Sequence, residues 1–194
     1  TNIERKTRKL RRDHGATFER VSVSNDPEVA MGELITLHQR RWNHAGGPGI
    51  FAREATRSFH KELARVLHPK GQMELTRVRT EGKETVGARY CFQFRGTSAF
   101  YASGFRPEPQ WSPYSLGLLM DAEGIRQSIQ LGLRCEDLLR GDGEYKRRYA
   151  PVQGQNVQLK VFRTARAWAQ HSAYLKLKCT AKRALSALKR RLKR

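Results

Sequence analysis

The sequence predicts a mixed α+β domain around a largely antiparallel sheet. Three strands are predicted, at residues 72–79, 85–94 and 97–105, and the short turns Glu81-Gly82-Lys83 and Arg95-Gly96 between them are typical of an antiparallel meander. Two amphipathic stretches precede this meander, and one follows it. Helices and strands grouped in this way are typical of an α+β domain.

The 194 residues allow one domain with a hydrophobic core and are too few for two domains of ordinary size. No apolar run approaches membrane-spanning length, and the first residues form no apolar signal core. The chain begins at Thr1 rather than Met, which is typical of a fragment or a processed product. Cys91, Cys135 and Cys179 are an odd number without CxxC spacing. They therefore argue against a disulfide framework and a zinc site, and they suit a reducing cytoplasm.

The formal net charge of +20 is carried by the two ends of the chain. Six of the 38 basic residues lie in 1–12 beside one acid, and fifteen lie in 145–194 without any acid. This leaves 17 basic and 17 acidic residues between positions 13 and 144. A neutral central region argues against a folded body whose surface binds nucleic acid.

The elements before the meander are a basic helix or arm over residues 1–14, a strand over 16–23 and two helices. Ser24-Asn25-Asp26-Pro27-Glu28 is a strong signal for the start of the first helix. It supplies a capping side chain, a proline at the first position and an acid in the first turn. This helix ends at the glycines of 46–49. The second helix begins at Ile50-Phe51 and ends at Pro69. We expect their inward residues to be Val29, Leu34, Leu37 and Trp42 on the first helix, and Phe59, Leu63, Val66 and Leu67 on the second.

The stretch after the meander predicts a helix from Ser115 to about Leu131. Ser115 follows a proline and is placed to cap the helix with its side-chain oxygen. Gly117 leaves the first turn without a side chain, where free backbone N–H groups and the helix dipole can hold a phosphate or pyrophosphate. An ordinary capped helix with an unimportant glycine fits the same residues. The expected apolar face is Leu118, Ala122, Ile125 and Ile129.

A short strand over 133–139 carries Asp137, and the glycine turn 141–143 closes it. Residues 144–149 then predict a brief helix that Pro151 stops. The alternation of Val157, Leu159 and Val161 predicts a last strand.

Two runs in this region resemble a known family. SPYSLG at 112–117 and EDLLRGDGEYKRRY at 136–149 are similar to bacterial GNAT-type acyltransferases associated with cellulose and exopolysaccharide biosynthesis, which are related to peptidoglycan-bridge aminoacyl transferases. That family carries a Ser-Pro-Gly helix start and an Asp-Phe-Leu-Arg-Gly … Tyr-Lys strand and turn. Leu138 stands where the family usually has Phe, and the helix start is spread over Ser115-Leu116-Gly117. The matching residues are Gly117, Asp137, Leu139, Arg140, Gly141, Tyr145 and Lys146.

The resemblance implies a GNAT-like fold, in which strand 97–105 and the helix after it splay from strand 133–139. In that fold the acyl-CoA thioester enters the gap, with its pyrophosphate at the helix start. The implied cosubstrate is acetyl-CoA or another acyl-CoA, and no metal is implied. The residues expected to bind it are Ser115, Leu116, Gly117 and Leu118.

Acyl transfer needs a base for the acceptor's proton, and an acid can protonate the leaving thiolate. The candidates for base are His60, His38 and Asp137. Tyr145 is the candidate acid, and Lys146 could hold a phosphate or orient Asp137. The residues expected to contact the acceptor are His38, Arg41, Trp42 and Arg140.

Each candidate also has a structural explanation. His60 fits a boundary position on an amphipathic helix. Asp137 fits an ion pair with Arg140 or Lys146, and Tyr145 fits an aromatic core residue with a polar tip. Gly-x-Ser-x-Gly, HExxH and Walker motifs are all absent from the sequence, so hydrolase, zinc-enzyme and nucleoside-triphosphate functions lack support.

Three functions are compatible with the sequence. The first is an acyl-CoA-dependent N- or O-acyltransferase, most simply an acetyltransferase, that acts on a sugar or a polysaccharide or cell-envelope precursor. The second is a transferase of the peptidoglycan-bridge type that takes its donor from charged tRNA, whose phosphates the basic ends would hold. The third is a non-catalytic basic module that binds membrane or nucleic acid. The neutral central region favours the first.

We divide the chain into an arm at 1–14, a GNAT-like domain at 15–163 and a basic tail at 164–194. In the tail, Trp168 and Leu175, followed by Ala181, Leu185, Leu188 and Leu192, are expected to form one apolar face. A cationic amphipathic helix suits an anionic lipid surface, so we expect a cytoplasmic protein that can lie peripherally at the inner membrane face. A solvated tail, or a helix that packs on its own domain, is the alternative.

Overall fold

The computed structural model describes residues 1–22, 26–141, 143–149, 152, 154–155, 157 and 159–191. The chain divides into two units, residues 1–151 and residues 152–194. The first unit holds a five-stranded mixed sheet between helices, which confirms the predicted α+β class. Ser24 and Asn25 of the predicted helix start, the turn residue Asp142 and the stop at Pro151 lie outside the described residues.

The strands of the sheet stand in chain order, and the first three pairs are antiparallel. The last pair is parallel and joins only three residues of each strand. The strands are β1 (Thr17–Arg20), β2 (Met73–Arg79), β3 (Thr85–Phe94), β4 (Thr97–Phe105) and β5 (Cys135–Asp137). The meander is therefore confirmed almost residue for residue, whereas the strand that we expected over 133–139 is shorter.

The turn between β3 and β4 explains why this hairpin is so clear in the sequence. Arg95 and Gly96 have φ values of 47° and 75°. Two consecutive residues with positive φ make the tight turn whose twist matches that of paired strands. Farther along the pair, the register shifts so that Tyr90 opposes Ala102 and Cys91 opposes Phe100. Tyr101 is thus the extra residue of a β-bulge in β4.

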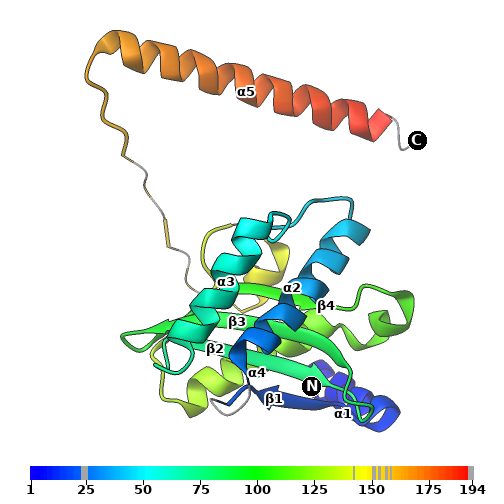
Figure 1. Cartoon of the computed structure of the whole chain (residues 1–194). Coiled ribbons are helices and arrows are strands. Elements are labelled where there is room, and N and C mark those ends of the chain that lie inside the picture. Colours follow the sequence, from blue (N-terminus) through cyan, green and yellow to red (C-terminus); the bar gives the residue numbers. More distant parts are fainter. Residues whose placement is uncertain are drawn as a thin grey trace. The chain divides into compact units, whose positions relative to one another are not determined.

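Helices cover both faces of the sheet. Figure 1 shows α2 (Pro27–His44) and α3 (Glu54–Leu67) over one face and α4 (Leu116–Gln130) over the other. The first core cluster joins α2 and α3 to the sheet around Leu34, and the second joins α1 (Asn2–His14) and α4 to the opposite face around Leu10. Leu10 is fully buried, so the basic segment that we expected as a helix or arm is a helix packed within the first unit.

The inward faces of the helices differ from those expected. Val29, Trp42 and Phe59 are 56%, 41% and 59% exposed, whereas Leu34 and Leu37 are buried as predicted. On α4, Ile129 is 71% exposed. The buried residues of α4 are instead Leu116, Leu119, Met120, Asp121, Gly124, Gln127 and Ser128. The reason is that the sheet beneath α4 is itself partly polar, as shown by Thr76, whose Oγ1 donates a hydrogen bond to Gln127 Oε1 at 2.9 Å.

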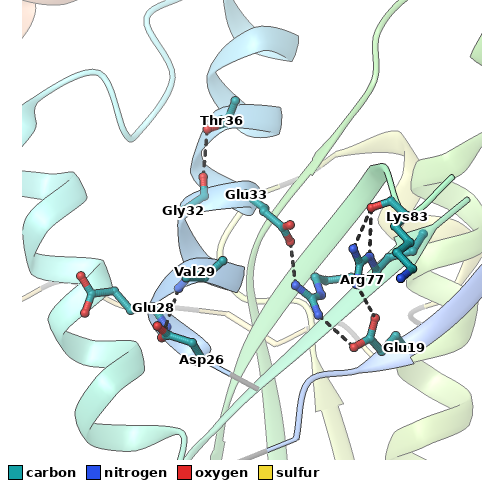
Figure 2. Close-up of polar contacts among 10 residues, drawn as sticks. Glu19, Asp26, Glu28, Val29, Gly32, Glu33, Thr36, Arg77 and Lys83 are labelled. Atoms are coloured by element: carbon teal, nitrogen blue, oxygen red, sulfur yellow. Dashed lines mark hydrogen bonds and ion pairs between the residues drawn. The ribbon is translucent and has the colours of Figure 1, made fainter. Parts of the chain in front are cut away.

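Polar contacts fix the start of α2 and its orientation on the sheet. Asp26 caps the helix, and its Oδ1 accepts hydrogen bonds from the backbone N–H of Glu28 and Val29 at 2.9 and 3.3 Å (Figure 2). Arg77 of β2 bridges Glu19 of β1 and Glu33 of α2, with both N···O distances at 2.9 Å (Figure 2). Because the Arg77 side chain is only 9% exposed, these pairs are better shielded from solvent than ordinary surface salt bridges.

Gly104 allows α2 to approach β4 closely. A Cβ atom at this position would lie 2.3 Å from the His38 backbone N and 2.8 Å from the Leu34 backbone O. These are backbone atoms that cannot rotate away, so any side chain would force the helix off the strand. The close approach brings the second half of α2 to the end of β4.

The second unit contains α5 (Ala165–Arg191). The strand that we expected over 157–161 is wrong, because its described residues Val157, Leu159 and Val161 have no strand partner and are 85–88% exposed. The single apolar face expected for the tail is also wrong. At about 100° per residue, Trp168 and Leu175 point more than about 100° away from Ala181. In the described part of the chain, no helix is both long and apolar enough to span a membrane.

Candidate active site

The candidate site lies where β4 and β5 part. The two strands pair only at Thr97 with Cys135, Ser98 with Glu136 and Ala99 with Asp137. From Phe100 onward the edge of β4 has no pairing with β5, and a cavity of about 670 Å³ opens there. Its lining comes from α2, the bulged end of β4, the start of α4 and the 3-10 helix η2 (Glu144–Arg148).

The start of α4 forms one wall of this cavity, but Ser115 does not cap the helix as expected. A 3-10 helix, η1 (Pro109–Tyr114), runs directly into α4, and Ser115 at the junction is left-handed with φ 54° and ψ 55°. Its side chain makes no capping bond. Instead, Lys6 of α1 donates from Nζ to Ser115 Oγ and to the Pro113 carbonyl, both at 2.8 Å. The basic N-terminal helix therefore brings an ammonium group to the start of α4.

Gly117 lines the cavity together with Ser115, Leu116 and Leu118, which are the residues expected at the donor site. A Cβ atom on Gly117 would lie 3.0 Å from Phe105 Cε1, so the missing side chain makes room for this ring. The guanidinium of Arg41 lies 4.3 Å from the centre of the same ring. A stack of Arg41, Phe105 and Gly117 thus links the wall from α2 to the wall from α4.

The α2 wall carries the residues that we expected to contact the acceptor. His38, Arg41 and Trp42 all line the cavity, whereas Arg140 does not. Burial lowers the pKa of His38 to about 4, so its imidazole is neutral at pH 7. Gln39 holds the following loop, because its Nε2 donates to the Pro48 carbonyl at 2.8 Å and its Oε1 accepts from the backbone N–H of residue 51 at 3.2 Å.

The Asp-Leu-Leu-Arg-Gly turn at 137–141 positions Tyr145 rather than presenting Asp137. Asp137 is exposed, lies outside the cavity lining, and its Oδ1 accepts from the backbone N–H of Leu139 at 2.7 Å. Lys146 donates from Nζ to three backbone carbonyls, those of residues 138, 139 and 140, at 2.6, 3.1 and 3.0 Å. Leu139 needs such support because its φ is +57°. Tyr145, next to this clamp, lines the cavity, and burial raises its pKa.

His60 lies outside the cavity lining and is buried. Its Nδ1 is 2.7 Å from the Tyr90 hydroxyl, and its ring packs 5.1 Å from that of Tyr101, the bulged residue. Burial lowers the pKa of His60. The structure therefore packs His60 against Tyr90 of β3 and Tyr101 of β4, and the shift of the helix face that exposes Phe59 accounts for its inward position.

Asp121 is the cavity residue that sequence reasoning missed. It is 9% exposed, lines the cavity and lies four residues after Gly117, on the same side of α4. Burial raises its pKa to about 6, since a charged carboxylate is disfavoured where water is excluded. The signal in the sequence was a single carboxylate inside the otherwise apolar run Leu116–Ala122.

A buried polar cluster lies behind Asp121. Arg89 of β3 is 2% exposed, and its Nη2 donates to Glu136 Oε1 at 2.6 Å. Ser128 donates to the other carboxylate oxygen of Glu136, also at 2.6 Å. Gly124 leaves the space for this guanidinium, because a Cβ there would lie 1.2 Å from Arg89 Nη1. The cluster joins β3, β5 and α4 on the closed side of the gap.

Comparisons with known proteins place this chain by its fold and by its sequence. No curated protein matches the sequence closely enough to be a relative. Among solved structures, one described as a probable acetyltransferase is 9% identical, with a TM-score of 0.52 over 76% of this chain and 99% of that one. An aminoglycoside antibiotic 6'-N-acetyltransferase from Acinetobacter baumannii is 10% identical, with a TM-score of 0.46 over 77% and 98% of the two chains.

A GNAT family acetyltransferase from Brucella melitensis, solved in complex with acetyl-CoA, is 15% identical, with a TM-score of 0.47 over 71% and 82% of the two chains. At these low sequence identities, the structural similarity shows a shared fold and nothing more. The sequence itself matches the profile of the acetyltransferase (GNAT) domain over residues 1–147. Because this match covers most of the chain, including α1, the sheet and the cavity, the chain belongs to the acetyltransferase (GNAT) domain family.

Proposed function

We propose that this acetyltransferase moves an acetyl group from acetyl-CoA to a hydroxyl or amino group of a sugar in a polysaccharide or cell-envelope precursor. The observation that carries the proposal is the cavity that runs from the start of α4, across the open edge of β4, to the end of α2. A donor can enter at one end of this cavity and an acceptor at the other. The reacting groups would then meet beside the Tyr101 bulge.

The donor end suits a diphosphate. Backbone N–H groups at the start of α4 carry partial positive charge, and Lys6 adds a full charge beside them. Gly117 keeps this wall free of a side chain except for the edge of the Phe105 ring. Phe100 to Phe105 of β4 present an unpaired strand edge along which the extended arm of coenzyme A could run.

The acceptor end suits a sugar. Trp42 and Tyr101 are 41% and 40% exposed and line the cavity beside His38 and Arg41. Partly exposed aromatic faces with a few polar groups nearby are typical of sites for ring-shaped polar ligands. The resemblance of residues 112–117 and 136–149 to acyltransferases of polysaccharide biosynthesis supports the same acceptor class.

Thermal unfolding with coenzyme A tests the donor site. A ligand present at 100 times its Kd stabilises the native state by about 2.7 kcal/mol. For a chain of this size we expect a rise in Tm of about 5–10 °C. Gly117→Asp places a carboxylate beside the proposed pyrophosphate and should abolish this rise. Gly82→Asp adds the same charge in the β2–β3 turn, where only Thr80 Oγ1 would lie within 4 Å, and should leave the rise unchanged.

Two results would contradict the donor assignment. The first is an unchanged rise in Tm for Gly117→Asp, and the second is stabilisation by tRNA that coenzyme A does not produce. The acceptor class is tested by release of free thiol from acetyl-CoA with cellobiose, glucosamine and, as a non-sugar amine, lysine. Turnover of lysine alone would rule out a sugar acceptor.

We further propose that the second unit holds the enzyme at an anionic membrane surface. Residues 152–194 contain twelve Lys/Arg and no acid. On α5, Trp168 and Leu177 are 59% and 71% exposed. Exposed aromatic and aliphatic side chains among cations are typical of helices that lie in the lipid headgroup region, where each Lys or Arg contributes about 1 kcal/mol.

Vesicle flotation with the full chain tests the membrane proposal. Lys176→Glu combined with Lys178→Glu should weaken binding to phosphatidylglycerol vesicles at least about 30-fold, because two attractive charges become repulsive. Arg5→Glu with Arg8→Glu makes the same change of charge on α1 and should have a smaller effect. Equal flotation on neutral vesicles would refute an anionic surface as the partner. A gel shift of tRNA at the same salt, without flotation on any vesicle, would refute a membrane partner.

A further inference from the structure

Asp121 is a buried carboxylate that faces the cavity without a partner. Its side chain is 9% exposed and lines the cavity with Gly117 and Leu118 of the same helix. No hydrogen bond or ion pair joins it to any residue that the structure describes. Buried carboxylates are normally paired or hydrogen-bonded, because removing an ionised group from water is costly. An unpaired carboxylate at this place is therefore available to a ligand.

The groups around Asp121 explain why it stays unpaired. Arg89 of β3 lies behind it, but the short bond to Glu136 of β5 engages that guanidinium. Arg41 of α2 faces it from the cavity side and stacks on the Phe105 ring instead of forming an ion pair. The phenols of Tyr145 and Tyr149 complete the surroundings from η2 and the residue that follows it. The charged groups around the carboxylate are thus Arg89, Glu136 and Arg41, and its open side faces the cavity.

From this arrangement we propose that Asp121 is the catalytic base that takes the proton of the acceptor; the proposal rests on the proposed acetyl transfer. The oxygen or nitrogen of the acceptor attacks the thioester carbonyl carbon while its proton passes to the Asp121 carboxylate. The new C–O or C–N bond forms, and the C–S bond breaks to release the thiolate. The thiolate then takes the proton from the Asp121 carboxylic acid, so that the enzyme returns to its starting state.

The burial of Asp121 also suits this carboxyl to the role of a base. A base works best when its pKa lies near the working pH, and burial raises the pKa of this carboxyl to about 6. The remaining candidates are less well placed. His38 has a pKa lowered by burial, Asp137 is exposed outside the cavity, and His60 is buried outside the cavity lining.

The test compares Asp121→Asn with Asp121→Glu and with Glu123→Gln. Glu123 is a carboxylate two residues away on α4 that bonds Arg126 and lies outside the cavity lining, so it controls for the loss of one charge on this helix. We measure release of thiol from acetyl-CoA as a function of pH. The acceptor is a sugar of the panel above or, where none reacts, water. Asp121→Asn should lower kcat at least about 100-fold and remove its rise near pH 6. Asp121→Glu should restore part of the rate, and Glu123→Gln should change little.

Two further readouts separate a base from a structural residue. Hydroxylamine attacks thioesters without prior loss of a proton, so its enzymatic reaction should survive in Asp121→Asn within about threefold. The rise in Tm with coenzyme A should also be unchanged, because the proposed donor site is intact. Equal loss with hydroxylamine and sugar, or a kcat–pH profile of Asp121→Asn that matches the wild type, would overturn the proposal. Loss of the coenzyme A effect in the wild type would instead overturn the proposed function.

Discussion

Gly124→Ala tests whether the buried Arg89–Glu136 pair holds α4 against the open end of the sheet. The added methyl group would lie 1.2 Å from Arg89 Nη1 and 2.1 Å from Cζ. The guanidinium must then move by about 2 Å to reach ordinary contact distance, which breaks its 2.6 Å bond to Glu136. Breaking one side of a buried ion pair costs about 3–5 kcal/mol. The better helix propensity of Ala offsets about 1 kcal/mol of this cost.

We therefore expect Gly124→Ala to lose about 2–4 kcal/mol of unfolding free energy, which is a fall in Tm of about 5–15 °C. The assay is urea unfolding followed by near-UV circular dichroism, which reports the packed aromatic residues of the first unit. Gly32→Ala is the matched control. That glycine also lies inside a helix, but its Cβ would meet only Lys61 Cε at 3.8 Å, so the change should stabilise the protein by about 0.5–1 kcal/mol.

A variant that lacks the buried ion pair shows whether the methyl group added by Gly124→Ala clashes with Arg89. In a chain that carries Arg89→Met and Glu136→Gln, the guanidinium and its partner charge are both gone. Gly124→Ala should then cost less than about 1 kcal/mol, since changes of contacting residues are not additive. The reasoning fails if Gly124→Ala is as well tolerated as Gly32→Ala, or if its cost is the same in both backgrounds.

Three other changes test the fold and the site. Asp121→Asn should match the wild type in unfolding free energy near pH 3.5 and exceed it by up to about 3 kcal/mol at pH 7, measured in urea. The sign follows because burial raises the pKa of this carboxyl from 3.8 to about 6, so the cost of ionising it in the folded state appears between these values and is complete above pH 6. Lys146→Met removes three hydrogen bonds to backbone carbonyls and should lower the unfolding free energy by about 1–3 kcal/mol. It should also speed amide hydrogen exchange in the turn at 138–140 and lower kcat, because Tyr145 is no longer held in place. Unchanged exchange would show that Lys146 does not hold this turn. Gly104→Ala should cost about 3 kcal/mol or more in thermal unfolding, because its Cβ would meet the α2 backbone at 2.3 Å, and a stable variant would refute that contact.

Local signals in the sequence predicted the sheet well. The short turns at 81–83 and 95–96 depend on neighbouring residues only, so the meander that they separate was visible without the fold. The start of α2 at Asp26 was visible for the same reason. The strand expected at 157–161 was wrong because alternation shows only that a segment could pair, and its partner would have to come from elsewhere in the chain.

Some of the residues predicted for the site line the cavity, and others do not. The residues at the start of α4, and Arg41 and Trp42 at the end of α2, were found because a motif or an aromatic and basic cluster marked them. Asp137 and Lys146 carry the strongest motif, yet the structure uses them to bond backbone within their own turn. A match to a motif therefore does not distinguish a residue that shapes a turn from one that touches a substrate.

Asp121 was not predicted from the sequence, because a prediction from apolar periodicity assumes that a helix buries its apolar side against an apolar sheet. The sheet under α4 presents Thr76 and the Arg89–Glu136 pair, so the helix buries Gln127 and Ser128 against them and leaves Ile129 exposed. This rotation places Asp121, which the expected apolar face did not include, on the cavity wall. A polar sheet face under a helix is therefore the physical cause of both the wrong helix face and the missed carboxylate.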